Sequence, residues 1–465
     1  MNTQADKRTE QRLAAGLARH PSVAAAKVIW GDRLVAYLVP DEHHAPVVHR
    51  ACGLAASGSL GRLSLHEPAG ELLMAQLNRT ETDFMYREVF VQNAYLRHGI
   101  GIPADAMVVD VGANIGMFSL LAAQRGTGTR VIAVEPVPEL AHAVSVNAYL
   151  HDVDIMVLSC GLGDHAGEVA FCYYPNNTLM SGIYGNAGDD RDVLRAYLAT
   201  APNVMLGAQL ERLVDDRMNV ELRRCRLTTL TEVVAAHGID RIDLLKIDAE
   251  KAEADVLAGI DQPTWAKVDQ VVLEVHDLQG RLRTIAEQLT ASGFDVTHDQ
   301  DQRLKLTPCH TMYARRPGAR EPAPTLTARR PQTMAALSSN LREFALRQLA
   351  GLPVPDEFVW LASIDGIESR ETCLATPQGR GLAALSAAWT ELFGAGSNTP
   401  EADFFDLGGD SLTAVRLLAR IEAQLGEEII EPDLIFTASR FGALAAAIGA
   451  AVRFREQSAG ESVSG

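Results

Sequence analysis

The 465-residue chain has few cysteines, a deficit of basic residues, and no long apolar run. Its six cysteines are scattered and form no CxxC pair. This spacing disfavours a zinc site or a disulfide framework and favours a reducing compartment. No stretch reaches the ~20 apolar residues that span a membrane. The opening residues, MNTQADKRTEQRLAAGL, contain no signal-peptide core. We therefore expect a cytoplasmic protein with no membrane partner and no bound metal.

The charge balance is acidic, with a formal net charge of -17. Because a phosphate backbone is bound by basic surfaces, nucleic acid is not an expected partner. Such a charge suits partners that carry basic patches. Hydrophobic residues make up 47% of the chain, which is enough for packed cores. The length predicts two to four domains.

Four stretches of the chain differ in pattern. Residues 1–45 predict a short helix followed by a hairpin, AAKVIWGDRLVAYLVP. Residues 60–316 alternate short apolar runs with helix-length segments, which predicts parallel strands and crossover helices. These runs include MVVDV, RVIAVEP, DLLKID and DQVVLEV. Residues 317–375 begin with a proline- and arginine-rich linker, and residues 380–455 predict a small helical bundle.

A glycine turn follows the first of these apolar runs. The segment DVGANIG, from Asp110 to Gly116, joins a predicted strand to a predicted helix. The next strand ends in Glu135, and an acidic residue about 20 positions after a glycine turn can bind ribose hydroxyls. A dinucleotide site would show GxGxxG, but Asn114 occupies the middle position. The turn therefore disfavours an NAD-dependent dehydrogenase.

Five ordered motifs over about residues 105–280 resemble the FkbM family of methyltransferases. They are DVGANIGMFSLLAA, AVEPVPELAHAVSVNAYL, GLGDHAGEV, LTTLTEVVAAHGIDRIDLLKIDAEKAEADVLAGI and VVLEVH. The upstream segment LNRTETDFMYREVFVQNAYLRHGI resembles the N-terminal cap of such domains in peptide and polyketide synthases. The resemblance implies a class I, Rossmann-like α/β fold, S-adenosylmethionine as cofactor and, usually, O-methylation. Lys251 stands where the family commonly has glycine, so the local turn and the substrate fit are open to change.

The same resemblance implies cofactor-binding residues at the strand ends and in the cap. They are Asp110, Gly112 and Asn114 around the cofactor's amino-acid end, Gly116 in the same turn, Glu135 at the ribose, Asp164 near the adenine, and Tyr86 and Glu88 closing the pocket.

Methyl transfer to a hydroxyl requires a positioned acceptor and a base. Open α/β sheets bind ligands at the carboxyl ends of strands, where Asp248 follows LLKI and where Glu274 and His276 end VVLEVH. These three are the candidate catalytic residues, and His276 is a candidate base because histidine titrates near pH ~6.5. Each could instead be structural: a strand-end hydrogen bond, a helix cap or strand packing. Together with Glu250, these residues could hold Mg²⁺, although the spacing does not require it. We expect Lys246 to be a structural charge at the strand end and not a catalyst.

The motif FFDLGGDSL, which contains Ser411, resembles the carrier-domain motif of non-ribosomal peptide synthetases. A serine at a helix start is otherwise a simple N-cap. The resemblance implies a four-helix carrier domain over 380–455 and 4′-phosphopantetheine on Ser411, attached by a phosphopantetheinyl transferase. Tethering of an acyl group on this arm raises its effective concentration to about the millimolar range.

Two flanking segments resemble parts of the small C-terminal subdomain of adenylation domains. They are ARHPSVAAAKVIWGDRLVAYLVP and NLREFALRQLAGLPVPDEFVWLASI. We therefore expect 1–45 and 317–375 to form an α+β remnant of that subdomain, interrupted by the methyltransferase. The sequence contains no large adenylation core, and IDGIESRET, near Ile364–Thr372, lacks the family's catalytic lysine. We expect a separate adenylation protein to load the carrier in trans.

These features together predict a methyltransferase of a non-ribosomal peptide or hybrid polyketide assembly line. It would O-methylate an acyl or aminoacyl group on Ser411 and pass it to a condensation or ketosynthase domain. Alternatives are N-methylation or methyl-ester formation by the same fold, and a carrier or docking module with an inactive methyltransferase scaffold. Lys251 favours inactivity, whereas the intact Asp110, Gly112 and Glu135 argue against it.

Overall fold

The structure, a computed structural model, divides into two compact units. One comprises Met1–Thr80 and Pro331–Gly465, and the other comprises Glu81–Arg330. The residues that the structure describes are 4–31, 33–199, 214, 217–301, 305, 307–323, 332–365, 367, 377–394, 397–399, 402–404, 407, 411–425 and 434–461. Among them, no helix has both the length and the apolar character needed to cross a membrane.

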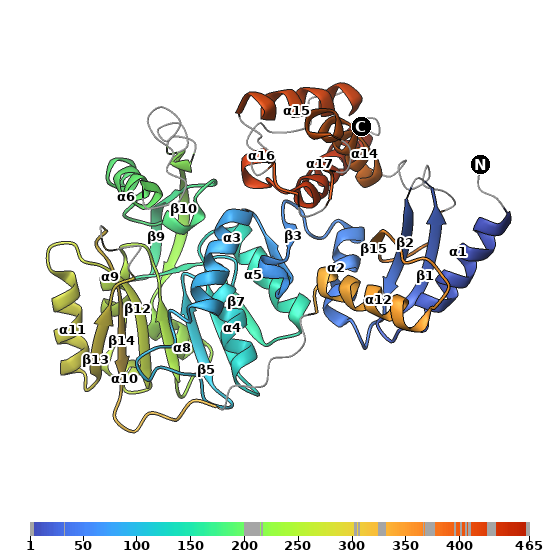
Figure 1. Ribbon diagram of the computed structural model, residues 1–465. Coiled ribbons are helices and arrows are strands. Elements are labelled where there is room, and N and C mark those ends of the chain that lie inside the picture. The colour runs from blue at the N-terminus through green and yellow to red at the C-terminus, as the bar shows by residue number, and fades with distance from the viewer. Residues whose placement is uncertain are drawn as a thin grey trace. The chain divides into compact units, whose positions relative to one another are not determined.

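A seven-stranded sheet forms the centre of the second unit (Figure 1), in the order β13-β14-β12-β11-β5-β6-β7. Its strands are β5 (Met107–Val111), β6 (Arg130–Val134), β7 (Ile155–Leu158), β11 (Leu244–Ile247), β12 (Gln270–His276), β13 (Asp295–Asp299) and β14 (Cys309–Arg315). Neighbouring strands from β12 to β7 are parallel, whereas β14 is antiparallel to both β12 and β13. The chain order reverses between β5 and β11, which creates a ligand-binding switch point.

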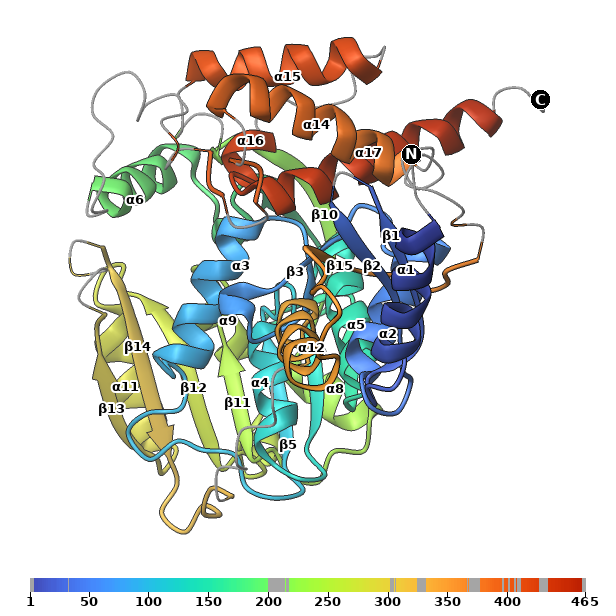
Figure 2. The same ribbon diagram turned by 45° about the vertical axis from the view of Figure 1, so that its right-hand side comes forward.

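The four apolar runs quoted above form β5, β6, β11 and β12, which confirms the predicted Rossmann-like α/β fold. Side chains of these strands are buried on both faces, which explains their nearly continuous apolar sequence. Connecting helices cover the sheet (Figures 1 and 2). They are α4 (Met117–Arg125), α5 (Pro138–His151), α8 (Leu230–Ala236), α9 (Glu253–Ala258), α10 (Gln262–Trp265) and α11 (Arg281–Ala291).

The second unit also contains a small sheet and a cap that frame one end of the large sheet. The small sheet has the order β8-β10-β9, with β8 (Gly161–Leu162), β9 (Gly167–Tyr173) and β10 (Glu221–Thr228). The cap and its neighbours are α3 (Arg79–Tyr86), a π-helical turn (Arg87–Val91), a 3₁₀ helix (Thr178–Met180) and α6 (Ala187–Ala199). Strand β10, ELRRCRLT, is largely polar and partly exposed, so it carries no apolar run that would predict it.

In the first unit, segments from both flanks of the chain share one sheet, in the order β1-β2-β15. Strands β1 (Val23–Trp30) and β2 (Leu34–Pro40) form the expected hairpin, and β15 (Glu357–Trp360) pairs in parallel with β2. The Asp356 carboxylate accepts a hydrogen bond from the Leu34 amide at 2.7 Å. Helices of this region are α1 (Gln4–Leu17), α2 (Pro46–Ser57) and α12 (Met334–Gln348), and β3 (Ser64–His66) pairs with β4 (Met74–Gln76).

The C-terminal part of the first unit is helical, as its apolar spacing predicts. Its described helices are α14 (Pro377–Phe393), α15 (Ser411–Leu425), α16 (Leu434–Thr437) and α17 (Phe441–Glu461). They pack around the fully buried Trp389 and Phe404, whose ring centroids lie 5.9 Å apart. Ser411 is the first residue of α15. Its side chain lies outside the described residues, as do motif positions 405, 406 and 408–410 and most of the segment near Ile364–Thr372.

Candidate active site

The glycine turn between β5 and α4 contains left-handed backbone conformations, which residues with side chains rarely adopt. Gly112 and Gly116 have φ values of 73° and 83°, and Asn114 has a φ of 50°. A Cβ atom on Gly112 would lie 1.8 Å from the Asp248 carbonyl oxygen. A Cβ on Gly116 would lie 3.1 Å from Val144 Cγ1, so this glycine permits close packing of α4 against α5. The turn thus brings bare backbone to the switch point.

We expect Gly112→Ala to destabilise the protein severely, because both the backbone conformation and the space oppose a methyl group. The cost is roughly 3 kcal/mol or more, since the clashing atom belongs to the backbone. Gly238→Ala is the matched control, because Gly238 also has a positive φ of 60° but, apart from its chain neighbours, nothing lies within 4 Å of its Cβ position. That change should cost about 1–2 kcal/mol. Urea unfolding of both variants measures the difference, and equal midpoints would contradict the tight contact at Gly112.

Glu135, at the end of β6, anchors the turn from the neighbouring strand. Its carboxylate accepts hydrogen bonds from the amides of Asn114 at 2.8 Å and Val137 at 2.9 Å. Burial raises the pKa of Glu135 to about 7. A carboxylate can accept about four hydrogen bonds, so the side chain retains acceptor capacity toward the cavity that it lines.

A buried polar chain connects the glycine turn to the wall of the site. The Asn114 side-chain amide donates to Thr178 Oγ1 at 3.0 Å, and the Thr178 hydroxyl donates to Glu81 Oε2 at 2.5 Å. Burial raises the pKa of Glu81 to about 7. Sequence analysis did not find this pair, because Glu81 and Thr178 lie 97 positions apart and no spacing rule links the two residues.

A cavity opens beside these residues at the carboxyl ends of β5, β6 and β11. Its polar lining includes Asn114, Glu135 and Asp248. Its apolar lining includes Leu140, Leu162, Phe171, Leu179 and Ile183. An apolar surface suits a purine ring, and a carboxylate with free acceptor positions suits ribose hydroxyls. The donor and acceptor set therefore fits S-adenosylmethionine.

Asp110 lies beneath the glycine turn and outside the cavity lining. Its side chain is fully buried, where it accepts a hydrogen bond from Ser119 Oγ at 2.6 Å. Lys246 Nζ lies 3.1 Å from the Asp110 carboxylate and donates to the Gly112 carbonyl at 2.9 Å. Burial alone would lower the pKa of Lys246, but the Asp110 and Asp248 carboxylates together outweigh burial and raise the pKa. Contact of Asp110 with the cofactor's amino-acid end, as the sequence suggested, stays a prediction.

Asp248 is the most accessible carboxylate at the end of β11, with 24% of its side chain exposed. Tyr95 from the cap donates its hydroxyl to Asp248 Oδ2 at 3.0 Å, and Lys246 Nζ lies 3.4 Å from the same oxygen. Tyr95 is another residue that sequence analysis missed. Burial, followed by the Asp248 charge, raises the pKa of Tyr95 well above its usual value, so its hydroxyl stays a donor.

His276 is buried among carboxylates at the end of β12. Its Nδ1 lies 3.1 Å from Glu253 Oε1, and its Nε2 lies 3.5 Å from Glu250 Oε2 and 3.9 Å from Glu274 Oε1. Burial alone would lower the pKa of His276; neighbouring groups, first Cys309 and then Glu253, nevertheless raise it to about 12. This environment disfavours the role of general base, because that role needs a neutral imidazole.

Two carboxyl groups near His276 have raised pKa values. Burial raises the pKa of Glu250 to about 8, and it raises the pKa of Glu274 well above its usual range. Asp248 and Glu250 line the cavity, whereas Glu274 and His276 lie behind them. The structure therefore brings together the three catalytic candidates from the sequence; their individual roles stay predictions.

Lys251 adopts the backbone conformation that the family's glycine would favour, with a φ of 74°. Its ammonium group forms an ion pair with the buried Asp190 of α6. Asp190 also accepts a hydrogen bond from the Tyr174 hydroxyl at 2.9 Å. The substituted position thus keeps a left-handed turn and gains a buried ionic contact.

The remaining predicted cofactor residues lie outside the cavity lining found in the described part of the chain. Asp164 is largely exposed, and its carboxylate lies 2.6 Å from His165 Nδ1. Tyr86 is buried and stacks on Phe90 with a centroid distance of 5.3 Å. Glu88 is half-buried in the π-helical turn. Their contacts with the cofactor stay predictions.

Two regions of the chain match families of known proteins. Residues 110–296 match the family described as methyltransferase FkbM domain, and residues 383–448 match the phosphopantetheine attachment site family. Over 442 residues, the chain is 34% identical to the AMB antimetabolite synthetase AmbE of Pseudomonas aeruginosa. That alignment covers 87% of this chain but 20% of AmbE, so the chain corresponds to about a fifth of that protein.

Two shorter relatives match over nearly their whole length. The 31-O-demethyl-FK506 methyltransferase FkbM of Streptomyces tacrolimicus is 39% identical over 249 residues, which cover 52% of this chain and 93% of the relative. Methyltransferase sdnD of Sordaria araneosa is 31% identical over 245 residues, which cover 50% of this chain and 89% of sdnD. The chain therefore belongs to the FkbM family of S-adenosylmethionine-dependent methyltransferases, and it carries a phosphopantetheine-attachment domain on its C-terminal side.

Proposed function

We propose that this chain O-methylates an acyl or aminoacyl group held as a thioester on the phosphopantetheine arm of Ser411. The observation that carries the proposal is the presence of both regions, the cofactor cavity and the attachment domain, in one chain. The name of the FkbM relative specifies methylation of an oxygen. AmbE is a synthetase, which supports a place on a non-ribosomal peptide assembly line.

The cavity supports distinct roles for the residues around it. Glu135 holds the ribose and Asn114 the neighbouring part of the cofactor, while the apolar lining receives the adenine. When bound, S-adenosylmethionine supplies a methyl group on a positively charged sulfur. Asp248 is the proton acceptor in this proposal, because its carboxylate lines the cavity. The hydrogen bond from the Tyr95 hydroxyl fixes the position of this carboxylate. His276 and Glu274 position this carboxyl cluster from behind.

The flanks of the methyltransferase are, in this proposal, a remnant of an adenylation subdomain. The pairing of β15 with β2 supports it, because residues from before and after the methyltransferase complete one sheet. The alignment with AmbE covers 87% of the chain, so it extends well beyond residues 110–296 of the methyltransferase match. A separate adenylation protein then loads the carrier, a phosphopantetheinyl transferase first modifies Ser411, and a condensation or ketosynthase domain receives the product.

Mass spectrometry of the intact, carrier-loaded chain tests the function. The phosphopantetheinylated protein is loaded with a series of hydroxylated aminoacyl groups and incubated with S-adenosylmethionine. We expect one methyl group on the ejected pantetheine fragment for at least one acyl group. Fragmentation and mild alkaline hydrolysis distinguish an ether from an N-methyl group or a methyl ester. If the chain binds the cofactor but methylates none of the loaded groups, the tethered-substrate proposal is wrong.

A further inference from the structure

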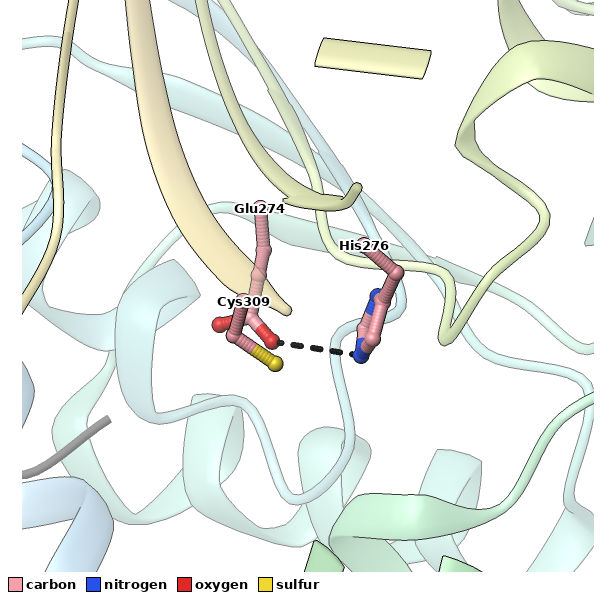
Figure 3. Close-up of side chains that lie close together, drawn as sticks. All are labelled: Glu274, His276 and Cys309. Atoms are coloured by element: carbon pink, nitrogen blue, oxygen red, sulfur yellow. Dashed lines mark ion pairs between the residues drawn. The ribbon is translucent and has the colours of Figure 1, made fainter. Parts of the chain in front are cut away.

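Three potential metal ligands meet at the junction of β12 and β14. His276 and Cys309 are directly paired in the antiparallel register of these strands. Glu274 precedes His276 by two positions, so its side chain lies on the same face of β12. Figure 3 shows the three side chains pointing toward one another. One ligand atom from each lies within 4.8 Å of the others.

The orientation of His276 resembles that of a metal-bound histidine. Its Nδ1 faces Glu253 Oε1 at 3.1 Å, while Glu253 is fully buried and accepts hydrogen bonds from the Lys251 amide and from Arg281. Histidine ligands usually donate their second ring N–H to such a carboxylate, which fixes the ring and leaves the other nitrogen for the metal. Here that nitrogen, Nε2, faces Glu250 and Glu274.

We propose that Glu274, His276 and Cys309 bind a divalent transition-metal ion of the Zn²⁺ class, with Glu250 at the fourth position. A thiolate, an imidazole and a carboxylate together suit a borderline ion, whereas Mg²⁺ and Ca²⁺ prefer oxygen ligands. Bonds of about 2.0–2.3 Å in a tetrahedron place ligand atoms about 3.3–3.8 Å apart. The distances from Nε2 to Glu250 and to Glu274, 3.5 Å and 3.9 Å, are close to this range.

The sequence does not predict this site, because it contains no CxxC pair and no recognised ligand spacing. Cys309 comes next to the other two ligands only through the pairing of β14 with β12. Cys309 follows His276 by 33 positions, and only the β12–β14 register brings the two together. Glu250 also lines the cofactor cavity, so an ion held there is next to the acceptor end of the site. The role of the site rests on the proposed function. An ion bound there would orient the oxygen of the methyl acceptor and favour its deprotonated form.

Cobalt substitution tests the site without any methylation assay. The full chain is treated with a chelator, dialysed and titrated with Co²⁺, whose thiolate complex absorbs in the near ultraviolet and whose tetrahedral form absorbs in the visible. We expect one equivalent of Co²⁺ with both bands, and displacement by Zn²⁺. Cys309→Ser should remove the near-ultraviolet band and weaken binding by at least about 100-fold. Cys52→Ser, which removes another buried cysteine, should leave both bands unchanged.

Glu253→Gln provides a second variant that keeps all four proposed ligands. It should weaken binding about 10–100-fold while preserving the spectrum, as expected for the carboxylate that orients the histidine. Thermal unfolding with and without Zn²⁺ shows whether each variant folds, because an ion bound to the native state raises the midpoint. Wild-type protein that folds but gives no thiolate band, or a Cys309→Ser variant that keeps it, overturns the proposal. If methyl transfer persists after chelation, the proposed function stands and only the metal site is wrong.

Discussion

Replacing Ser411 with alanine is expected to abolish both phosphopantetheine attachment and methylation of a carrier-bound group. The hydroxyl of Ser411 is the only atom of that side chain that can form the phosphodiester, so the loss should be complete. Intact mass spectrometry after treatment with a phosphopantetheinyl transferase measures it directly. Wild-type protein should gain one phosphopantetheine group, and Ser411→Ala should gain none.

The control for this variant is Ser397→Ala, in the same helical domain. The Ser397 hydroxyl donates to the Gly394 carbonyl at 2.7 Å and belongs to no carrier motif. This variant should be modified like wild type. Ser411→Ala should still bind S-adenosylmethionine and slowly methylate a free pantetheine thioester, because it loses only the millimolar effective concentration of a tethered substrate. Attachment of phosphopantetheine to Ser411→Ala would place the site at another residue.

Replacing Glu135 with alanine should reduce the affinity for S-adenosylmethionine by about 10²–10⁴-fold. In the proposed role of Glu135, the change removes two hydrogen bonds from ribose hydroxyls to a charged acceptor, at about 1.5–3 kcal/mol each. It also leaves the amides of Asn114 and Val137 without their carboxylate acceptor, which loosens the glycine turn. Isothermal titration calorimetry of cofactor binding measures the loss.

Two comparisons make the Glu135 result specific. Glu139→Ala removes a carboxylate in the first turn of α5 that pairs with Arg223 at 2.8 Å and does not line the cavity, so it should leave the affinity unchanged. Affinity of the wild type should fall as the pH drops from 8 to 6. Burial raises the pKa of Glu135 to about 7, so the carboxyl is protonated, and a weaker acceptor, below that pH. A pH-independent affinity, or an equal loss in Glu139→Ala, would contradict ribose binding by Glu135.

Sequence patterns predicted the parts of the fold whose signals are local. The runs MVVDV and RVIAV are β5 and β6, and the glycine turn and Glu135 meet at the switch point as their spacing indicates. Helical spacing likewise predicted α14, α15 and α17. In each case burial on both faces of a strand, or on one face of a helix, leaves a periodic apolar trace in the sequence.

Contacts between distant and largely polar segments left no such trace. Strand β10 is rich in arginine and β15 is four residues long, so neither has an apolar run long enough to predict a strand. The hydrogen bond of Tyr95 to Asp248 spans 153 positions. The environment of His276 depends on Glu253 and Cys309, which pair with it only after α9 and β14 are in place. The residue type of His276 suggested a general base, whereas its neighbours favour a protonated imidazole or the metal-bound imidazole proposed above.

The shared sheet of the two flanks has a consequence for the order in which the chain folds during its synthesis. Strands β1 and β2 leave the ribosome before the methyltransferase does, but β15 begins more than 300 residues after β2 ends. At about 5–20 residues per second, this gap lasts roughly 15–60 s. Throughout that time the edge of β2 that β15 later covers exposes unpaired backbone groups, which invite strand pairing with other nascent chains. This sheet is thus begun before the methyltransferase is made and completed only after all of it has emerged.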